Sequence, residues 1–134
     1  MQIITLTESQ KQTLSKHADS EKPNEACAIL FGTESNQSCK VEKIFLTENI
    51  EKSPVNFTIS AEQILEADKM ERESSLQIIG IFHSHPNSQA YPSETDKKFM
   101  EVNPVVWVIY SGTSKEFRGF SLDSEIKEVE IKTL

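Results

Sequence analysis

Two histidines one residue apart, His83 and His85, are the part of this sequence best suited to chemistry. They follow residues 76–82, a mostly apolar run that is typical of a central strand covered on both faces. Because side chains at positions i and i+2 of a strand lie on the same face, both imidazoles can reach one metal ion. Taken alone, a His-x-His pair on a strand more often serves packing or hydrogen bonding, so the metal interpretation depends on a third ligand.

Asp96 is the candidate for that third ligand, eleven residues after His85. Ser93 is a natural helix N-cap, which places Asp96 in the first turn of a helix with its carboxylate directed back toward the loop. The helix dipole also favours an acid there, so helix capping and metal binding are compatible roles. Pro86 and Pro92 restrict the loop between the candidate ligands. The sequence therefore predicts one catalytic zinc ion with three protein ligands and a bound water.

Glu25 is the candidate general base for that water. It stands directly before residues 26–31, an apolar run that predicts a buried strand, where an acid is hard to explain as part of the core. Its carboxylate could take a proton from the water and give it to a leaving amine. The hydroxyl of Ser93 could donate to the oxyanion of a tetrahedral intermediate. The alternatives are that Glu25 is only a solvated acid and that Ser93 only caps a helix.

Together these positions resemble the JAMM motif of the MPN+ (Mov34/MPN/PAD-1) zinc metalloproteases, in the compact form found in archaea and bacteria. The motif here consists of Glu25, then His83-Ser84-His85-Pro86, then Ser93 after seven residues counted from His85, with Asp96 three positions further on. Family members often have Glu-x-Cys-Gly at the start of the motif, and Ala28 stands here in place of that glycine. The substitution adds one methyl group in a strand and changes no residue that could do chemistry.

The resemblance implies an α/β (α+β) fold, an MPN/JAMM domain with a central mixed β-sheet flanked by helices, similar to cytidine deaminases. It also implies that the zinc ligands are His83, His85 and Asp96, that Glu25 is the general base, and that Ser93 is the oxyanion donor. The implied activity is that of an isopeptidase that cleaves between the C-terminal glycine of a ubiquitin-like modifier and a lysine amine. Its partners would be ubiquitin-like proteins or their lysine-linked conjugates.

Two other functions stay open from the sequence. The same chemistry would let a peptidase trim the C-terminus of a ubiquitin-like sulfur-carrier protein, with only the leaving group changed. A non-catalytic MPN domain that only binds partners is the alternative from another class, although relatives of that kind lack the motif. A homodimer is also expected to be possible, because related domains often pair.

The elements expected around these residues are strands mixed with helices. Strands are predicted at residues 3–6, 26–32, 39–46, 76–82, 105–110, 117–122 and 126–131, and residues 56–59 are expected to be extended. Helices are predicted from residue 7 to about 18, over about 61–74, and from residue 93 onward. Thr7 with Gln10, and Ser60 with Gln63, have the spacing of capping boxes.

Both cysteines, Cys27 and Cys39, are expected to be free thiols. A hairpin with its turn near Ser35 would place Cys27 opposite about Ile44 and Cys39 opposite about Gly32, so the two sulfurs would not face each other. Two cysteines also fall short of a four-ligand zinc finger.

Composition and charge limit the class of protein further. With 134 residues, 37% of them hydrophobic and 26% charged, the chain fits a single globular domain over residues 1–134. Acidic residues outnumber basic ones by 21 to 14, and the lysines are scattered, so nucleic acid is not an expected partner. The first residues lack the basic start and apolar run of a signal peptide, and no apolar run is long enough to cross a membrane. We therefore expect a cytoplasmic protein with no membrane partner.

Overall fold

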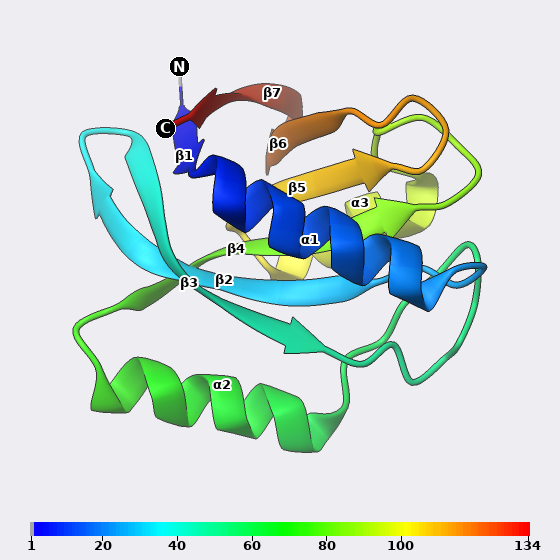
Figure 1. Ribbon diagram of the computed structural model, residues 1–134. Helices are drawn as coiled ribbons and strands as arrows, with labels where there is room; N and C mark the ends of the chain where they lie inside the picture. Colours follow the sequence, from blue (N-terminus) through cyan, green and yellow to red (C-terminus); the bar gives the residue numbers. More distant parts are fainter. Residues whose placement is uncertain (1) are drawn as a thin grey trace.

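The structure, a computed structural model, describes residues 2–134 and contains seven strands and three helices within that range (Figure 1). The strands are β1 (Ile3–Leu6), β2 (Cys27–Ser35), β3 (Ser38–Thr47), β4 (Gln77–His85), β5 (Val106–Ser111), β6 (Phe117–Asp123) and β7 (Glu125–Thr133). The helices are α1 (Glu8–Glu21), α2 (Ala61–Glu73) and α3 (Glu94–Val102). None of these helices has the length and apolar character needed to cross a membrane. The mixed α+β character predicted from the sequence is confirmed.

All seven strands form one sheet in the order β1-β3-β2-β4-β5-β6-β7, and the sheet closes into a barrel. The sheet is mixed, as expected, because β1 pairs in parallel with β3 and β7, β4 pairs in parallel with β5, and the remaining pairs are antiparallel. Closure depends on β1, in which Ile3 pairs with Ser38 on one side and with Glu130 on the other. The sequence predicted a central sheet flanked by helices and not a closed barrel. Residue patterns do not show which strands pair to close a sheet.

Strand alternation divides the side chains of the central strands between two environments. Inside the barrel, Ala28, Leu30, Phe82, Val108 and Tyr110 pack with Leu14 and Ala18 of α1. On the outer face, Ile29 and Phe31 pack with Ala67 of α2, while Trp107 and Ile109 pack near Met100 of α3. Figure 1 shows α1 and α2 on opposite sides of β2 and β4 accordingly. After the bulge near Gly80, the odd-numbered residues Ile81, His83 and His85 of β4 belong to the outer face.

The connection between β3 and α2 contains residues 56–59, which were expected to be extended. They form no strand and lie in an irregular loop. Phe57 is buried and Ile59 partly buried against the outer face of the barrel, so both pack without strand pairing. Ser60 caps α2 as predicted, but the capping box is absent because Gln63 Oε1 accepts from the Glu48 amide at 2.8 Å.

Helix α1 begins as predicted, but α1 and β4 both end later than predicted. The Thr7 and Gln10 capping box of α1 is confirmed, with both of its hydrogen bonds present. Helix α1 continues to Glu21, three residues beyond its predicted end. Strand β4 is also longer than predicted and extends through His85, so both histidines lie within the strand.

The predicted register of the β2–β3 hairpin is wrong. Cys27 pairs with Thr47 and Cys39 with Glu34, because the two turn residues are Asn36 and Gln37, one position later than expected. A β-bulge between Phe31 and Gly32 shifts the pairing by one further residue. The conclusion for the cysteines nevertheless stands, since both are buried free thiols.

Candidate metal centre

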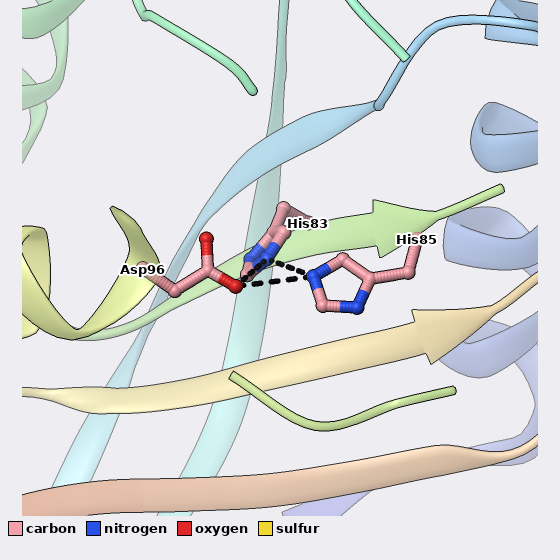
Figure 2. Close-up of side chains that lie close together, drawn as sticks. All are labelled: His83, His85 and Asp96. Carbon is pink, nitrogen blue, oxygen red and sulfur yellow. Dashed lines mark hydrogen bonds and ion pairs between the residues drawn. The ribbon is translucent and has the colours of Figure 1, made fainter. Parts of the chain in front are cut away.

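The two histidines and the aspartate predicted as ligands form a compact buried triangle (Figure 2). His83 Nε2 lies 3.0 Å from His85 Nε2, and each of these nitrogens lies 3.1 Å from Asp96 Oδ2. Figure 2 shows the carboxylate extending from α3 toward the two imidazoles of β4. Three side chains from two elements thus direct one donor atom each to a common point.

Strand geometry positions the histidines. Because β4 is extended through His85, the two imidazoles share its outer face. Parallel pairing with β5 sets His83 beside Ile109 and His85 beside Ser111, which fixes the depth of each ring along the sheet. This local arrangement is the one predicted from the His-x-His spacing.

A capping box positions Asp96. The Ser93 Oγ accepts from the Asp96 amide at 3.1 Å, and Asp96 Oδ2 accepts from the Ser93 amide at 2.9 Å. The N-cap role of Ser93 was predicted, whereas the return bond from the carboxylate was not. That return bond holds Oδ2, the oxygen that faces the imidazoles, against the start of α3. Helix capping and assembly of the cluster are therefore achieved by the same two residues.

The hydrogen bonds around the triangle show that it attracts positive charge. A backbone carbonyl can only accept, so the 2.8 Å contact of His85 Nδ1 with Gln89 O places a proton on Nδ1 and, in the neutral ring, a lone pair on Nε2. That lone pair then faces the Asp96 carboxylate oxygen, and two acceptors at 3.1 Å need a proton or a cation between them. Within residues 2–134, the buried Nδ1 atom of His83 has no hydrogen-bond partner.

The pKa directions agree with this description. Burial lowers the pKa of His83. Burial also acts to lower the pKa of His85, but hydrogen bonds with Asp96 and Gln89 outweigh it and leave that pKa raised. For Asp96, burial opposes ionisation, yet the hydrogen bonds with His83 and His85 lower its pKa well below the usual range. The carboxylate is therefore ionised and holds positive charge at the imidazoles.

The donor set fits a divalent transition metal, and the three residues could hold one ion. Two imidazole nitrogens and one carboxylate oxygen match the three protein ligands of a catalytic zinc site. Zinc bonds of about 2.0–2.1 Å in tetrahedral geometry place ligand atoms about 3.3–3.4 Å apart. The observed separations of 3.0–3.1 Å would need to widen by only a few tenths of an ångström.

Glu25 lies beside this cluster, although it is almost sixty residues away in sequence. Cys27 pairs with His83 in the β2–β4 ladder, and Ala26 exchanges bonds with Ser84, whose Oγ accepts the Ala26 amide at 2.8 Å. Continuing this antiparallel register brings Glu25 level with His85. Glu25 is only 2% exposed, so the alternative of a solvated acid is wrong.

The Glu25 carboxylate is poised to exchange protons near neutral pH. Burial raises its pKa to about 8, even though the charge of His85 acts in the opposite direction. Its Oε1 atom is buried and has no hydrogen-bond partner in the part of the chain that the structure describes. Ser93, by contrast, is exposed. Because its Oγ acts as the acceptor in the capping bond, the hydroxyl hydrogen is available to donate.

Several residues that support the cluster were not recognised in the sequence. The Phe57 ring stacks on His83 with centroids 4.9 Å apart, and Trp107, predicted only as core, meets the same imidazole edge-on at 5.7 Å. Ser111 Oγ donates to the Ser88 carbonyl at 2.7 Å and so holds the loop that supplies Gln89. No local spacing links these residues to the histidines, so only the assembled sheet could have identified them.

An apolar pocket of about 310 Å³ lies next to the cluster, between α2 and α3. It shares Phe57 and Trp107 with the surroundings of His83 and is also lined by Ile64 and Phe99, both partly exposed. A larger pocket of about 610 Å³, lined by residues such as Gln2, Cys39 and Lys127, contains none of the candidate site residues. Of these two pockets, the smaller one therefore borders the candidate metal centre.

Comparison with known proteins gives consistent matches. Residues 7–123, which include the whole cluster, match the family model described as prokaryotic homologs of the JAB domain. The chain is 33% identical to a protein named desampylase from Pyrococcus furiosus, over 81% of this chain and 74% of that protein. It is also 33% identical to the CysO-cysteine peptidase of Mycobacterium tuberculosis, over 71% of this chain and 64% of that protein, just under two thirds of its length. A solution structure of a Desulfitobacterium hafniense protein aligns with a TM-score of 0.88 at 32% identity, over 98% of this chain and 92% of that one.

Proposed function

The chain belongs to the family of prokaryotic JAB-domain homologs, which includes hydrolases of the JAMM type, and we propose that it is a zinc-dependent isopeptidase. Its substrate would be the bond between the C-terminal glycine of a ubiquitin-like modifier and a lysine amine. The single observation that supports this best is the buried triangle of His83, His85 and Asp96, with the Glu25 carboxylate beside it. Burying an acid costs free energy. A scaffold that only binds partners would not need such an acid next to three atoms that could bind a metal.

The metal would be held by His83 Nε2, His85 Nε2 and Asp96 Oδ2, the three atoms that face one another. Bound there, zinc would lower the pKa of a water molecule and polarise the carbonyl of the bond to be cleaved. The hydrogen bond from His85 Nδ1 to Gln89 O keeps the other nitrogen of that ring directed at the metal position.

Glu25 would transfer the proton, and Ser93 would stabilise the negative charge that develops on the carbonyl oxygen. The Glu25 carboxylate takes a proton from the attacking water as its oxygen adds to the carbonyl carbon. It then gives this proton to the lysine nitrogen as the carbon–nitrogen bond breaks, so the carboxylate is regenerated. Burial raises the pKa of Glu25 to about 8 in the metal-free chain, and the charge of a bound zinc ion would favour the ionised form that accepts a proton. The Ser93 hydroxyl donates a hydrogen bond to the oxyanion that develops between the two steps.

A second candidate function is trimming of the C-terminus of a ubiquitin-like sulfur-carrier protein. It is supported by the 33% identity to a CysO-cysteine peptidase, equal to the identity to the desampylase. Both reactions use the same residues and differ in the group that leaves. In either case, the apolar pocket between α2 and α3 would receive an apolar side chain of the modifier's C-terminal tail.

The experiment that separates these functions measures zinc content and cleavage in the same preparation. Purified protein is expected to bind one zinc ion and to lose activity with a chelator. It is then offered a lysine-linked conjugate of a ubiquitin-like protein and, in parallel, a carrier that ends in one extra residue. Preferential cleavage of the conjugate supports the isopeptidase, and preferential cleavage of the extended carrier supports the peptidase.

Variants assign the activity to this site. His83→Ala is expected to abolish both zinc binding and cleavage, whereas Glu25→Gln keeps the zinc and loses turnover. Glu94→Gln is the matched control, because Glu94 is an exposed acid at the start of α3 and its loss should leave turnover unchanged. A protein that binds no zinc, or a zinc-loaded protein that cleaves neither substrate, would rule out the proposal in favour of the non-catalytic scaffold.

A further inference from the structure

We propose that Asn49 is a positioning residue for Glu25, because its buried side chain joins the Glu25 backbone to the loop that carries Phe57. This inference rests on the function proposed above, in which Glu25 is the base. Asn49 follows the end of β3 and is 2% exposed, which is unusual for an asparagine outside a helix or strand. A buried amide needs partners for all of its donors and acceptors, and Asn49 has them.

The Asn49 amide makes hydrogen bonds in all four of its directions. Its Nδ2 donates to the carbonyls of Glu25 and Asn56, both at 3.0 Å, and lies 3.5 Å from the carbonyl of Ser53. Its Oδ1 accepts from the backbone amides of Glu51 and Thr58, both at 3.1 Å. Carbonyls cannot donate and amides cannot accept, so this pattern fixes which end of the side chain is nitrogen. The amide therefore has a single orientation and contacts five backbone groups, one at Glu25 and four in the loop that follows Asn49.

These contacts determine the backbone position of Glu25. Its carbonyl accepts from Asn49, and its N–H donates to the Ser53 carbonyl at 2.8 Å. Both backbone groups of Glu25 thus bind the 49–58 loop, while the next amide, of Ala26, binds Ser84. Among the described residues, Glu25 Oε1 has no hydrogen-bond partner, so the position of this oxygen depends on that of the Glu25 backbone. Loss of the Asn49 contact would let the base move relative to the histidines.

The same side chain also places Phe57. The two peptide groups on either side of Phe57 contribute the Asn56 carbonyl and the Thr58 N–H, and both bind Asn49. The Phe57 ring stacks on His83. Asn49 therefore links the backbone of the proposed general base to the loop whose phenylalanine stacks on a proposed metal ligand.

The test compares Asn49→Ala and Asn49→Asp with the natural chain. Aspartate has nearly the same shape and keeps both accepting contacts, but it cannot donate to the carbonyls of Glu25 and Asn56. Both variants are expected to keep one zinc ion and a KM within about threefold, because the three ligand residues are unchanged. The kcat is expected to fall about 10- to 100-fold, since a displacement of roughly 1 Å can reduce turnover by that factor.

Two controls separate positioning from loss of stability. Thr7→Ala removes the N-cap of α1 far from Glu25 and should reduce stability without changing kcat. In a Glu25→Gln background, Asn49→Asp should reduce the residual kcat less than about twofold, because a residue that acts through Glu25 has nothing left to position. Equal losses in both backgrounds, loss of zinc together with kcat, or full activity of both Asn49 variants would overturn the inference.

Turnover in the Glu25→Gln background could be too slow to measure. In that event, a solved structure of zinc-loaded Asn49→Ala tests the inference. Displacement of Glu25 and Phe57 from the metal ligands supports the positioning role, and an unmoved Glu25 overturns it. If the natural chain cleaves neither substrate, the proposed function fails, but this structure still tests whether Asn49 places Glu25. The two failures are therefore distinguishable.

Discussion

The backbone N–H of Gly112 donates to the carbonyl oxygen of His85 at 2.9 Å, which fastens the turn after β5 to the end of the strand that carries both histidines. The approach is close enough to exclude any side chain at position 112. A Cβ atom there would lie 2.6 Å from the carbonyl oxygen of Pro86 and 3.1 Å from its Cα, and both of these are backbone atoms.

Gly112→Ala should therefore destabilise the protein by about 1–3 kcal/mol, because the backbone after His85 must shift to make room. The shift also moves the loop that holds the His85 ring, so zinc affinity should fall about tenfold. Urea denaturation and zinc titration against a competing chelator measure the two effects. Ser114→Ala, an exposed position in the same turn, is the matched control. Unchanged stability and affinity in Gly112→Ala would show that the turn does not support the site.

Ser93→Ala should lose both a helix cap and an oxyanion donor. The expected loss of stability is about 1 kcal/mol, the usual contribution of an N-cap serine. The expected loss in kcat is roughly 100-fold, the effect of removing one donor to an oxyanion. Ser60→Ala is the control, because Ser60 caps α2 with the same type of bond outside the metal centre. If the two variants lose equal stability and neither loses kcat, Ser93 only caps the helix.

The stability of the metal-free protein should depend on pH through Glu25. Its pKa is about 8 in the folded chain and near 4.5 when unperturbed, so between these values the folded state holds a proton that the unfolded state has released. Folding stability therefore falls as pH rises from about 4.5 to 8, by up to about 1.4 kcal/mol per pH unit from this group. Glu25→Gln should remove that decline and be more stable than the natural chain at pH 8, with little difference near pH 4.5.

Chemical denaturation of both proteins across this pH range measures the effect. The exposed acid Glu94 provides the control, since Glu94→Gln should leave the pH profile of the natural chain unchanged. Parallel profiles for the natural chain and Glu25→Gln would mean that burial does not raise the pKa of Glu25.

Phe57→Leu should lower zinc affinity with only a modest loss of stability. Leucine keeps most of the buried apolar volume, whereas the stacked contact with His83, worth about 0.5–1.5 kcal/mol for an aromatic pair, is lost. Phe99→Leu is the matched control, because Phe99 packs against Phe57 and has no ring contact with His83. Calorimetric zinc titration compares the two variants. Equal affinity in both would show that the ring of Phe57 does not hold the imidazole.

The parts of the site set by short-range rules could be predicted from the sequence, and the parts set by strand pairing could not. Alternation along one strand placed His83 and His85 on a common face, and helix capping placed Asp96 toward them. Glu25 reaches the cluster only because β2 pairs with β4, which no local spacing records. Its role was therefore suggested by the resemblance to a family and not by geometry.

For the fold, too, features set by local signals could be predicted, and features set by strand pairing could not. Most strands and all three helices were predicted, since apolar periodicity and capping residues are local signals. The register of the hairpin was wrong because a bulge and the exact turn position each shift the pairing. The packing of Phe57 and Ile59 on the outer face could not be predicted, because their alternation with polar residues does not show which surface they cover.

Strand β1 has a consequence for self-association. It is only four residues long, yet it pairs with β3 on one side and β7 on the other, so every strand of the sheet has two neighbours. Removing residues 1–6 would expose the backbone groups of both β3 and β7, and such free edges pair readily with other chains. A chain shortened in this way should form higher oligomers at concentrations where the full sequence does not, which sedimentation velocity would detect. By pairing with both β3 and β7, β1 would therefore protect the protein against aggregation.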